Sequence, residues 1–163
     1  MEESVDCYRR ALALRQDLPD VLNNLGAALK SLGRVDEAIE SYRRAISVNP
    51  QFAEAHNNLG VALQRLGRLE EAADSYRRAI KINAKMADAH CNLGKALAGL
   101  RRSAEAVDCY KKALEINPGF SEAAGLLGTA LMALGKHEEG LAMEQQGFGV
   151  IRFSVDQGVV FKR

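Results

Sequence analysis

Residues 23–34 read NNLGAALKSLGR, and this stretch decides the fold because it returns three times further along the chain. Its copies, each offset by 34 residues, are NNLGVALQRLGR (57–68), CNLGKALAGLRR (91–102) and GLLGTALMALGK (125–136). Aligned at this offset, residues 19–52 and 53–86 are identical at 18 of 34 positions. Self-similarity at a fixed period of this length is typical of repeat proteins, in which each unit packs mainly on its neighbours.

Each unit is predicted to form a pair of helices. In the first unit Leu25, Leu29 and Leu32 follow the three- and four-residue spacing of a helix, and Gly33 supplies the left-handed conformation that ends it. A second helix begins with acidic residues and ends at Pro50, because proline cannot continue the hydrogen-bond ladder. Its apolar face consists of Ala38, Tyr42, Ala45 and Ile46.

The unit resembles the tetratricopeptide repeat (TPR), a 34-residue pattern of large residues, Leu-Gly, alanines, an aromatic residue and proline. In residues 19–52 these positions hold Leu22, Leu25, Gly26, Leu29, Ala38, Tyr42, Ala45 and Pro50. The next two units match in register, except that Ala84 replaces one proline. The resemblance implies an all-α solenoid, a right-handed superhelix of antiparallel helix pairs whose first helices line the concave side.

The same pattern divides the chain into repeats. Residues 1–18 supply only the second helix of a truncated repeat, and residues 121–146 form a degenerate fourth one. Three full repeats lie between them, at residues 19–52, 53–86 and 87–120. Neither end offers the polar cap with which repeat arrays normally finish. We therefore expect a fragment of a longer protein, or ends that another molecule covers.

The last residues, GFGVIRFSVDQGVVFKR (147–163), break the helical pattern. They are rich in β-forming residues around the turn signal Asp156-Gln157-Gly158. We expect a short non-helical tail, either irregular or β, that begins a following domain or is a linker. Alternatively, it docks extended on the last repeat or in the concave groove of a neighbouring copy.

Composition excludes several classes of partner and location. With 22 Lys and Arg against 21 Asp and Glu, the net charge is +1, so no nucleic-acid or membrane partner is expected. The sequence has no membrane-length apolar run, and its first residues are not expected to act as a secretory signal. Three cysteines cannot all pair internally, which favours a reducing, cytoplasmic location.

Basic pairs recur on the second helices and are interpreted as part of a solvated outer face. In each pair the second base follows an acid by four residues, the favourable spacing for a helical ion pair. These predicted pairs are Asp6–Arg10, Glu40–Arg44, Asp74–Arg78 and Asp108–Lys112.

Signals of catalysis are absent from the sequence. It has no phosphate-binding loop, zinc-protease motif, C-x-x-C or G-x-S-x-G, so we expect no catalytic residue, cofactor or metal. His56 and His90 share one repeat position and are interpreted as packing residues. Cys7 and Cys109 are expected to be buried, and Cys91 to face the groove, where it could react.

The concave groove is the predicted binding surface. By resemblance, the expected peptide-binding residues are Asn23, Asn24, Lys30, Asn57, Asn58, Gln64, Arg65, Asn92 and Lys95. Three of these asparagines recur one repeat apart, and an amide can pair with a peptide backbone whatever its side chains. This ladder is similar to the one in the TPR superhelix of the O-linked N-acetylglucosamine transferase, which holds peptides in this way. The alternative is that Asn-Leu-Gly is simply common in the family.

Charge selectivity in the groove is expected from Lys30, Arg65 and Lys95 against Asp20, Glu54 and Asp88. Chaperone-binding relatives clamp a terminal carboxylate with a lysine at the fifth repeat position, where this chain has Asn23, Asn57 and Cys91. A ligand of that kind is therefore not expected.

Three functions remain open. The first is a non-catalytic protein–protein interaction scaffold that binds an extended peptide or protein segment. The second is a self-assembling structural protein that uses its ends and its tail to form a homo-oligomer. The third is the targeting arm of a larger enzyme, such as a glycosyltransferase.

Overall fold

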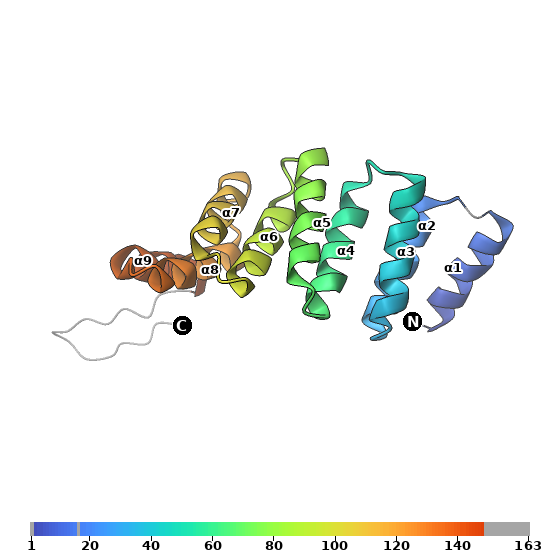
Figure 1. The fold of residues 1–163 in the computed structure, drawn as a ribbon, viewed down its shortest axis with the longest axis horizontal. Helices are drawn as coiled ribbons and strands as arrows, with labels where there is room; N and C mark the ends of the chain where they lie inside the picture. Colours follow the sequence, from blue (N-terminus) through green and yellow to red (C-terminus); the bar gives the residue numbers. More distant parts are fainter. Residues whose placement is uncertain (1, 16, 149–163) are drawn as a thin grey trace.

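The chain forms a row of helices stacked side by side (Figure 1). The computed structural model describes residues 2–15 and 17–148, and this part of the chain contains helices and no strand. The helices are α1 (Glu2–Leu14), α2 (Pro19–Ser31), α3 (Val35–Val48), α4 (Ala53–Arg65), α5 (Leu69–Ile82), α6 (Ala87–Gly99), α7 (Ser103–Ile116), α8 (Ser121–Ala133) and α9 (His137–Phe148). The expected all-α solenoid is confirmed. None of the described helices is long and apolar enough to cross a membrane.

The turns inside the helix pairs depend on left-handed residues. Gly33, Gly67 and Gly135 have φ of 80°, 75° and 79°, a conformation that glycine adopts without steric cost. Arg101 holds the same repeat position between α6 and α7 and has φ of 60°. It is the one non-glycine residue with positive φ in the described part of the chain.

The core is built from one contact that recurs at the repeat spacing. Tyr42 and Tyr76 are fully buried, and each ring lies flat against a glycine of the first helix of its own repeat. A Cβ added to Gly26 would lie 2.6 Å from Tyr42 Cε1, and one on Gly60 would lie 2.5 Å from Tyr76 Cε1. Tyr110 repeats this contact in the third pair. The missing glycine side chain is therefore what lets each tyrosine enter the core.

The last helix pair packs differently. In this pair the aromatic position holds Glu144, and α9 instead approaches α8 directly through Gly140. A Cβ on Gly140 would lie 2.9 Å from the carbonyl oxygen of Gly128 and 2.6 Å from Met132 Cγ. The loss of the tyrosine thus does not remove the helix. It extends to Phe148, two residues into the predicted tail, and the rest of that tail lies outside the described residues.

The stack curves with its first helices on the inner side. Helices α2, α4, α6 and α8 each touch the next member of this series. Within the described part of the chain, the backbones of the second helices α3, α5, α7 and α9 lie further apart, with no Cα atoms within 8 Å of one another. Long side chains still bridge the gap, as where Arg43 on α3 meets Glu71 on α5 at 3.8 Å. Helices on the inside of a curved stack lie closer together than those on the outside, so α2, α4, α6 and α8 form the concave surface.

Candidate functional site

The concave surface carries a row of asparagines. Asn23, Asn57, Asn58 and Asn92 are half-buried on it, and Asn24 is exposed. All five lie in the second turn of a first helix, immediately before the hydrophobic residues that enter the core. The first helices therefore hold these amides on the concave surface.

The asparagines pair with one another across the boundaries between repeats. Asn58 Nδ2 donates to Asn23 Oδ1 at 3.0 Å, and Asn92 Nδ2 donates to Asn57 Oδ1 at 3.2 Å. The donor comes from the later repeat in both pairs, so the bonds share one direction along the groove. An amide has two N–H donors and an oxygen with two lone pairs. Each pair therefore leaves unused donors and acceptors on both side chains.

Two further predicted groove residues have partners inside the protein. Gln64 Oε1 accepts a hydrogen bond from the Tyr76 hydroxyl at 2.9 Å. Lys95 forms an ion pair with Glu122 at 2.6 Å. Glu122 is absent from the residues predicted from sequence, although the repeat offset would have found it, because it follows Asp20, Glu54 and Asp88 in register.

Lys30 and Arg65 are the predicted groove cations that have no acidic partner. Arg65 Nη1 donates to the backbone oxygen of Lys30 at 3.3 Å, which brings the two residues together. Neither cation lies within 4.0 Å of a carboxylate of the described residues. Burial lowers the pKa of Lys30, and the nearby positive charge of Arg65 lowers it further.

The predictions for the cysteines are corrected by the structure. Cys91 does not face the groove as an accessible thiol: it is fully buried, and burial raises its pKa to about 11. Cys7 was expected to be buried and is exposed, whereas Cys109 is half-buried. Cys91 was expected to be the reactive thiol. Because Cys7 on α1 is exposed and Cys91 is buried, Cys7 should instead react faster.

The two histidines serve as buried polar packing residues. His56 Nε2 lies 3.1 Å from the carbonyl oxygen of Pro50, and His90 Nε2 lies 3.1 Å from that of Ala84. Burial lowers the pKa of His56. No group of three His, Cys, Asp or Glu side chains among the described residues is arranged to hold a metal.

Ion pairs on the outer surface follow a pattern that differs from the predicted one. The predicted pairs at a four-residue spacing are not formed among the described residues. Instead, Glu37 accepts two hydrogen bonds of 2.6 Å from Arg34 and one of 3.1 Å from Arg9 on α1. These bonds lower the pKa of Glu37, mainly through Arg34. The arginines thus link successive repeats, although each exposed pair contributes little to stability.

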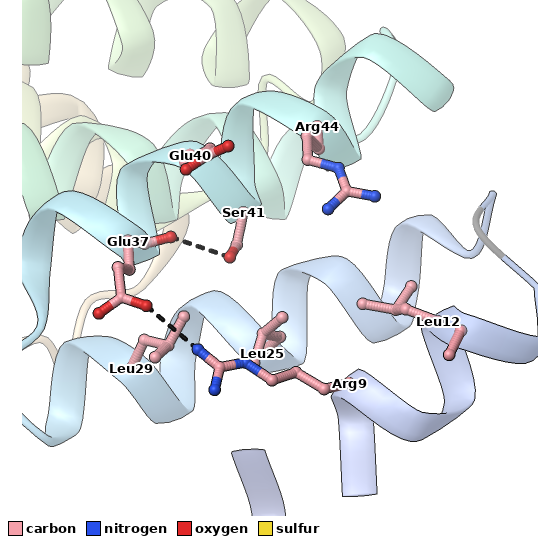
Figure 2. A pocket seen from close by; sticks show the side chains of 9 residues that line it. Arg9, Leu12, Leu25, Leu29, Glu37, Glu40, Ser41 and Arg44 are labelled. Carbon is pink, nitrogen blue, oxygen red and sulfur yellow. Dashed lines mark hydrogen bonds and ion pairs between the residues drawn. The ribbon is translucent and has the colours of Figure 1, made fainter. Parts of the chain in front are cut away.

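Crevices open on the outer side, where successive second helices diverge. The first encloses about 400 Å³ and has a floor of Leu25 and Leu29 between the walls of α1 and α3 (Figure 2). A similar crevice of about 300 Å³ has a floor of Leu59 and Leu63, one repeat further on. The sequence pattern indicates a solvated outer face and gives no sign of these hollows, which follow from the divergence of the helices.

Comparisons with known proteins agree with the helix pairs described above. A sequence model described as "TPR repeat" matches residues 1–33, 28–67 and 65–100. Two models described as "Tetratricopeptide repeat" match residues 87–120 and 109–142. No curated protein matches the chain in sequence.

Solved structures with the same fold extend the comparison. A crystal structure of MamA has a TM-score of 0.83 at 27% identity, with 88% of this chain and 84% of that chain covered. The first TPR of Spaghetti (RPAP3), bound to the HSP90 peptide SRMEEVD, has a TM-score of 0.71 at 27% identity. That likeness covers 72% of this chain and 93% of the other. YrrB, with a TM-score of 0.78 at 21% identity over 88% and 76% of the two chains, shares the fold.

Proposed function

Because the chain belongs to the tetratricopeptide repeat family, we propose that it is an interaction scaffold that binds an extended peptide or protein segment along its concave groove. It acts by binding rather than by catalysis. A structure with 27% identity, that of the first TPR of Spaghetti, contains a bound peptide, which supports this class of function.

The directed asparagine pairs carry the proposal. Asn58 and Asn92 are each fixed by one hydrogen bond to the preceding repeat, so their amides have a set orientation before a ligand arrives. Each still has an acceptor oxygen and a second N–H, the two groups that an extended peptide backbone requires. Pre-ordered side chains lose less conformational entropy on binding than mobile ones.

The test is selection from a random peptide library displayed on a carrier, with the whole chain as bait. We expect the wild-type protein to retain peptides. The triple variant Asn24→Ala, Asn58→Ala and Asn92→Ala should bind the selected peptides roughly tenfold or more weakly, because each lost hydrogen bond contributes about 1 kcal/mol to binding. The matched control is a second triple variant, Asn83→Ala, Asn117→Ala and Ser47→Ala. These residues lie outside the groove, the asparagines in turns and the serine on the outer helix α3.

Circular dichroism checks that the variant chain remains folded. The groove assignment is wrong if the folded groove variant binds the selected peptides as tightly as the control does. It is also wrong if wild-type protein retains no peptide above background.

Self-association is the second candidate function. Leu14 on α1 is 92% exposed and Leu141 on α9 is 52% exposed, and these helices lie at opposite ends of the row (Figure 1). Apolar surface of this kind favours contact between copies. Sedimentation over a range of concentrations, with wild type and with Leu14→Ser combined with Leu141→Ser, decides the question. A monomer at every concentration in both proteins contradicts self-association.

A further inference from the structure

Two like charges stand together at one edge of the groove. Lys30 lies near the end of α2 and Arg65 is the last residue of α4, and the guanidinium of Arg65 reaches the backbone oxygen of Lys30. No carboxylate of the described residues neutralises either cation, whereas Lys95 in the next repeat is paired with Glu122. The repulsion between the two cations is therefore left uncompensated, and a bound anion would relieve it.

A buried hydroxyl beneath the same edge also lacks a partner. Tyr76 donates its hydroxyl hydrogen to Gln64 at 2.9 Å. Tyr42 holds the same position one repeat earlier and is fully buried, yet its hydroxyl has no hydrogen-bond partner. The repeat position of Gln64 is occupied there by Lys30, whose ammonium group has donors and no acceptor. This edge therefore holds several donors and lacks the acceptor that the next repeat provides.

We propose that Lys30 and Arg65 form a binding position for an anionic side chain, a carboxylate or a phosphate, on the peptide that occupies the groove. The inference rests on the proposed function and adds the charge of the ligand at one place along it. The arginine can offer paired donors to two anionic oxygens, and the lysine adds a point charge. Lys95 does not form a second such position, because Glu122 already neutralises it.

The test uses the same displayed library, with each peptide joined to its carrier at the C-terminus so that side chains supply the anionic groups. The key variant is Lys30→Gln, which removes the charge and gives Tyr42 the acceptor that Tyr76 has in Gln64. We expect this variant to be at least as stable as wild type. The matched control is Lys112→Gln on α7, a lysine paired with Glu115 at 2.6 Å on the outer surface.

We expect wild type and Lys112→Gln to select peptides enriched in Asp and Glu, and Lys30→Gln to select peptides without this enrichment. Replacing the selected glutamate by glutamine should weaken binding to wild type by about threefold to tenfold, and hardly at all to Lys30→Gln. The difference should shrink as salt is added. A peptide with phosphoserine in place of that glutamate distinguishes the two anions. If it binds wild type more tightly than the glutamate peptide does, the position prefers phosphate to carboxylate.

The outcomes separate this inference from the proposed function. Peptides that bind wild type without any preference for acidic residues overturn the anion position and leave the groove function intact. The anion position is also overturned if replacing the peptide's glutamate by glutamine lowers the affinity for wild type and for Lys30→Gln by the same factor. A failure of wild type to select any peptide overturns the proposed function and this inference together.

Discussion

Asn58 Nδ2 donates a hydrogen bond of 3.0 Å to Oδ1 of Asn23, one repeat earlier, on the concave surface. The asparagines that we assign to peptide binding are therefore also part of the packing between repeats. A substitution that removes one of them changes the stability of the array as well as its ligand contacts, and the two effects are separable by comparing neighbouring asparagines.

Asn23→Ala should lower the free energy of unfolding by about 0.5–1.5 kcal/mol, because it leaves the half-buried amide of Asn58 without its acceptor. Asn24→Ala, at an exposed position next to it, should change stability by less than about 0.5 kcal/mol. Urea unfolding measures both. Equal losses in the two variants would show that the pair contributes nothing to stability.

Arg101→Gly should stabilise the protein. Arg101 holds φ at 60°, where Gly33, Gly67 and Gly135 occur in the other repeats. Removing the left-handed strain should stabilise the folded state by more than the added flexibility of glycine stabilises the unfolded chain. The free energy of unfolding should therefore rise by about 0.5–1 kcal/mol. The reverse change, Gly67→Arg, should destabilise by a similar amount. Thermal unfolding of both variants checks the sign, and a lower midpoint for Arg101→Gly would contradict the strain.

Gly60→Ala should destabilise by about 1–3 kcal/mol, because the new methyl group would lie 2.5 Å from the ring of a fully buried tyrosine. The control is Gly119→Ala, whose added methyl group would meet only Asn117 Oδ1, at 3.7 Å. That change should stay within about 0.5 kcal/mol of wild type. Similar denaturation midpoints for the two variants would mean that the glycine–tyrosine contact yields without cost.

Stability should fall at alkaline pH. Burial raises the pKa of Cys91 from 9.0 to about 11 and that of Tyr42 from 10.0 to about 12, so the folded state retains protons that the unfolded chain has lost. The stability due to Cys91 is complete below pH 9 and decreases as the pH rises towards 11. Urea unfolding between these pH values should show a steeper decrease for wild type than for Cys91→Ala.

Thiol labelling gives an independent check on the same cysteine. Exposed Cys7 should react with a thiol reagent in the folded protein, and Cys91 only after unfolding. Rapid labelling of Cys91 in native buffer would contradict its burial.

The periodicity of the sequence was enough to predict the helix pairs, and the resemblance to the tetratricopeptide repeat predicted their arrangement as a solenoid. The periodicity was less informative about side-chain direction. Cys91 shares a repeat position with Asn23 and Asn57, and the pattern therefore predicts that all three face the groove. The thiol lies in the core because a small, weakly polar group loses little on leaving water, whereas an amide keeps its hydrogen bonds at the surface.

Contacts between repeats were the other part that the pattern could not predict. The asparagine pairs join residues 35 apart, one more than the repeat length, so alignment of equivalent positions does not bring them together. Glu37 likewise binds Arg9 on α1, in the preceding repeat, in addition to its local partner Arg34. Such pairings depend on how far one helix is displaced along its neighbour, which only the packed structure defines.

The polar links between first helices also determine how the array responds to force. Asn58–Asn23, Asn92–Asn57 and Lys95–Glu122 join neighbours on the inner side, whereas tyrosine packing holds each helix pair together. A hydrogen bond of this kind contributes only about 1 kcal/mol, much less than a buried aromatic ring. We therefore expect tension along the row to break these inner links before it separates the helices of a pair. The parts of the array that yield most easily under load would then be those that line its inner curve.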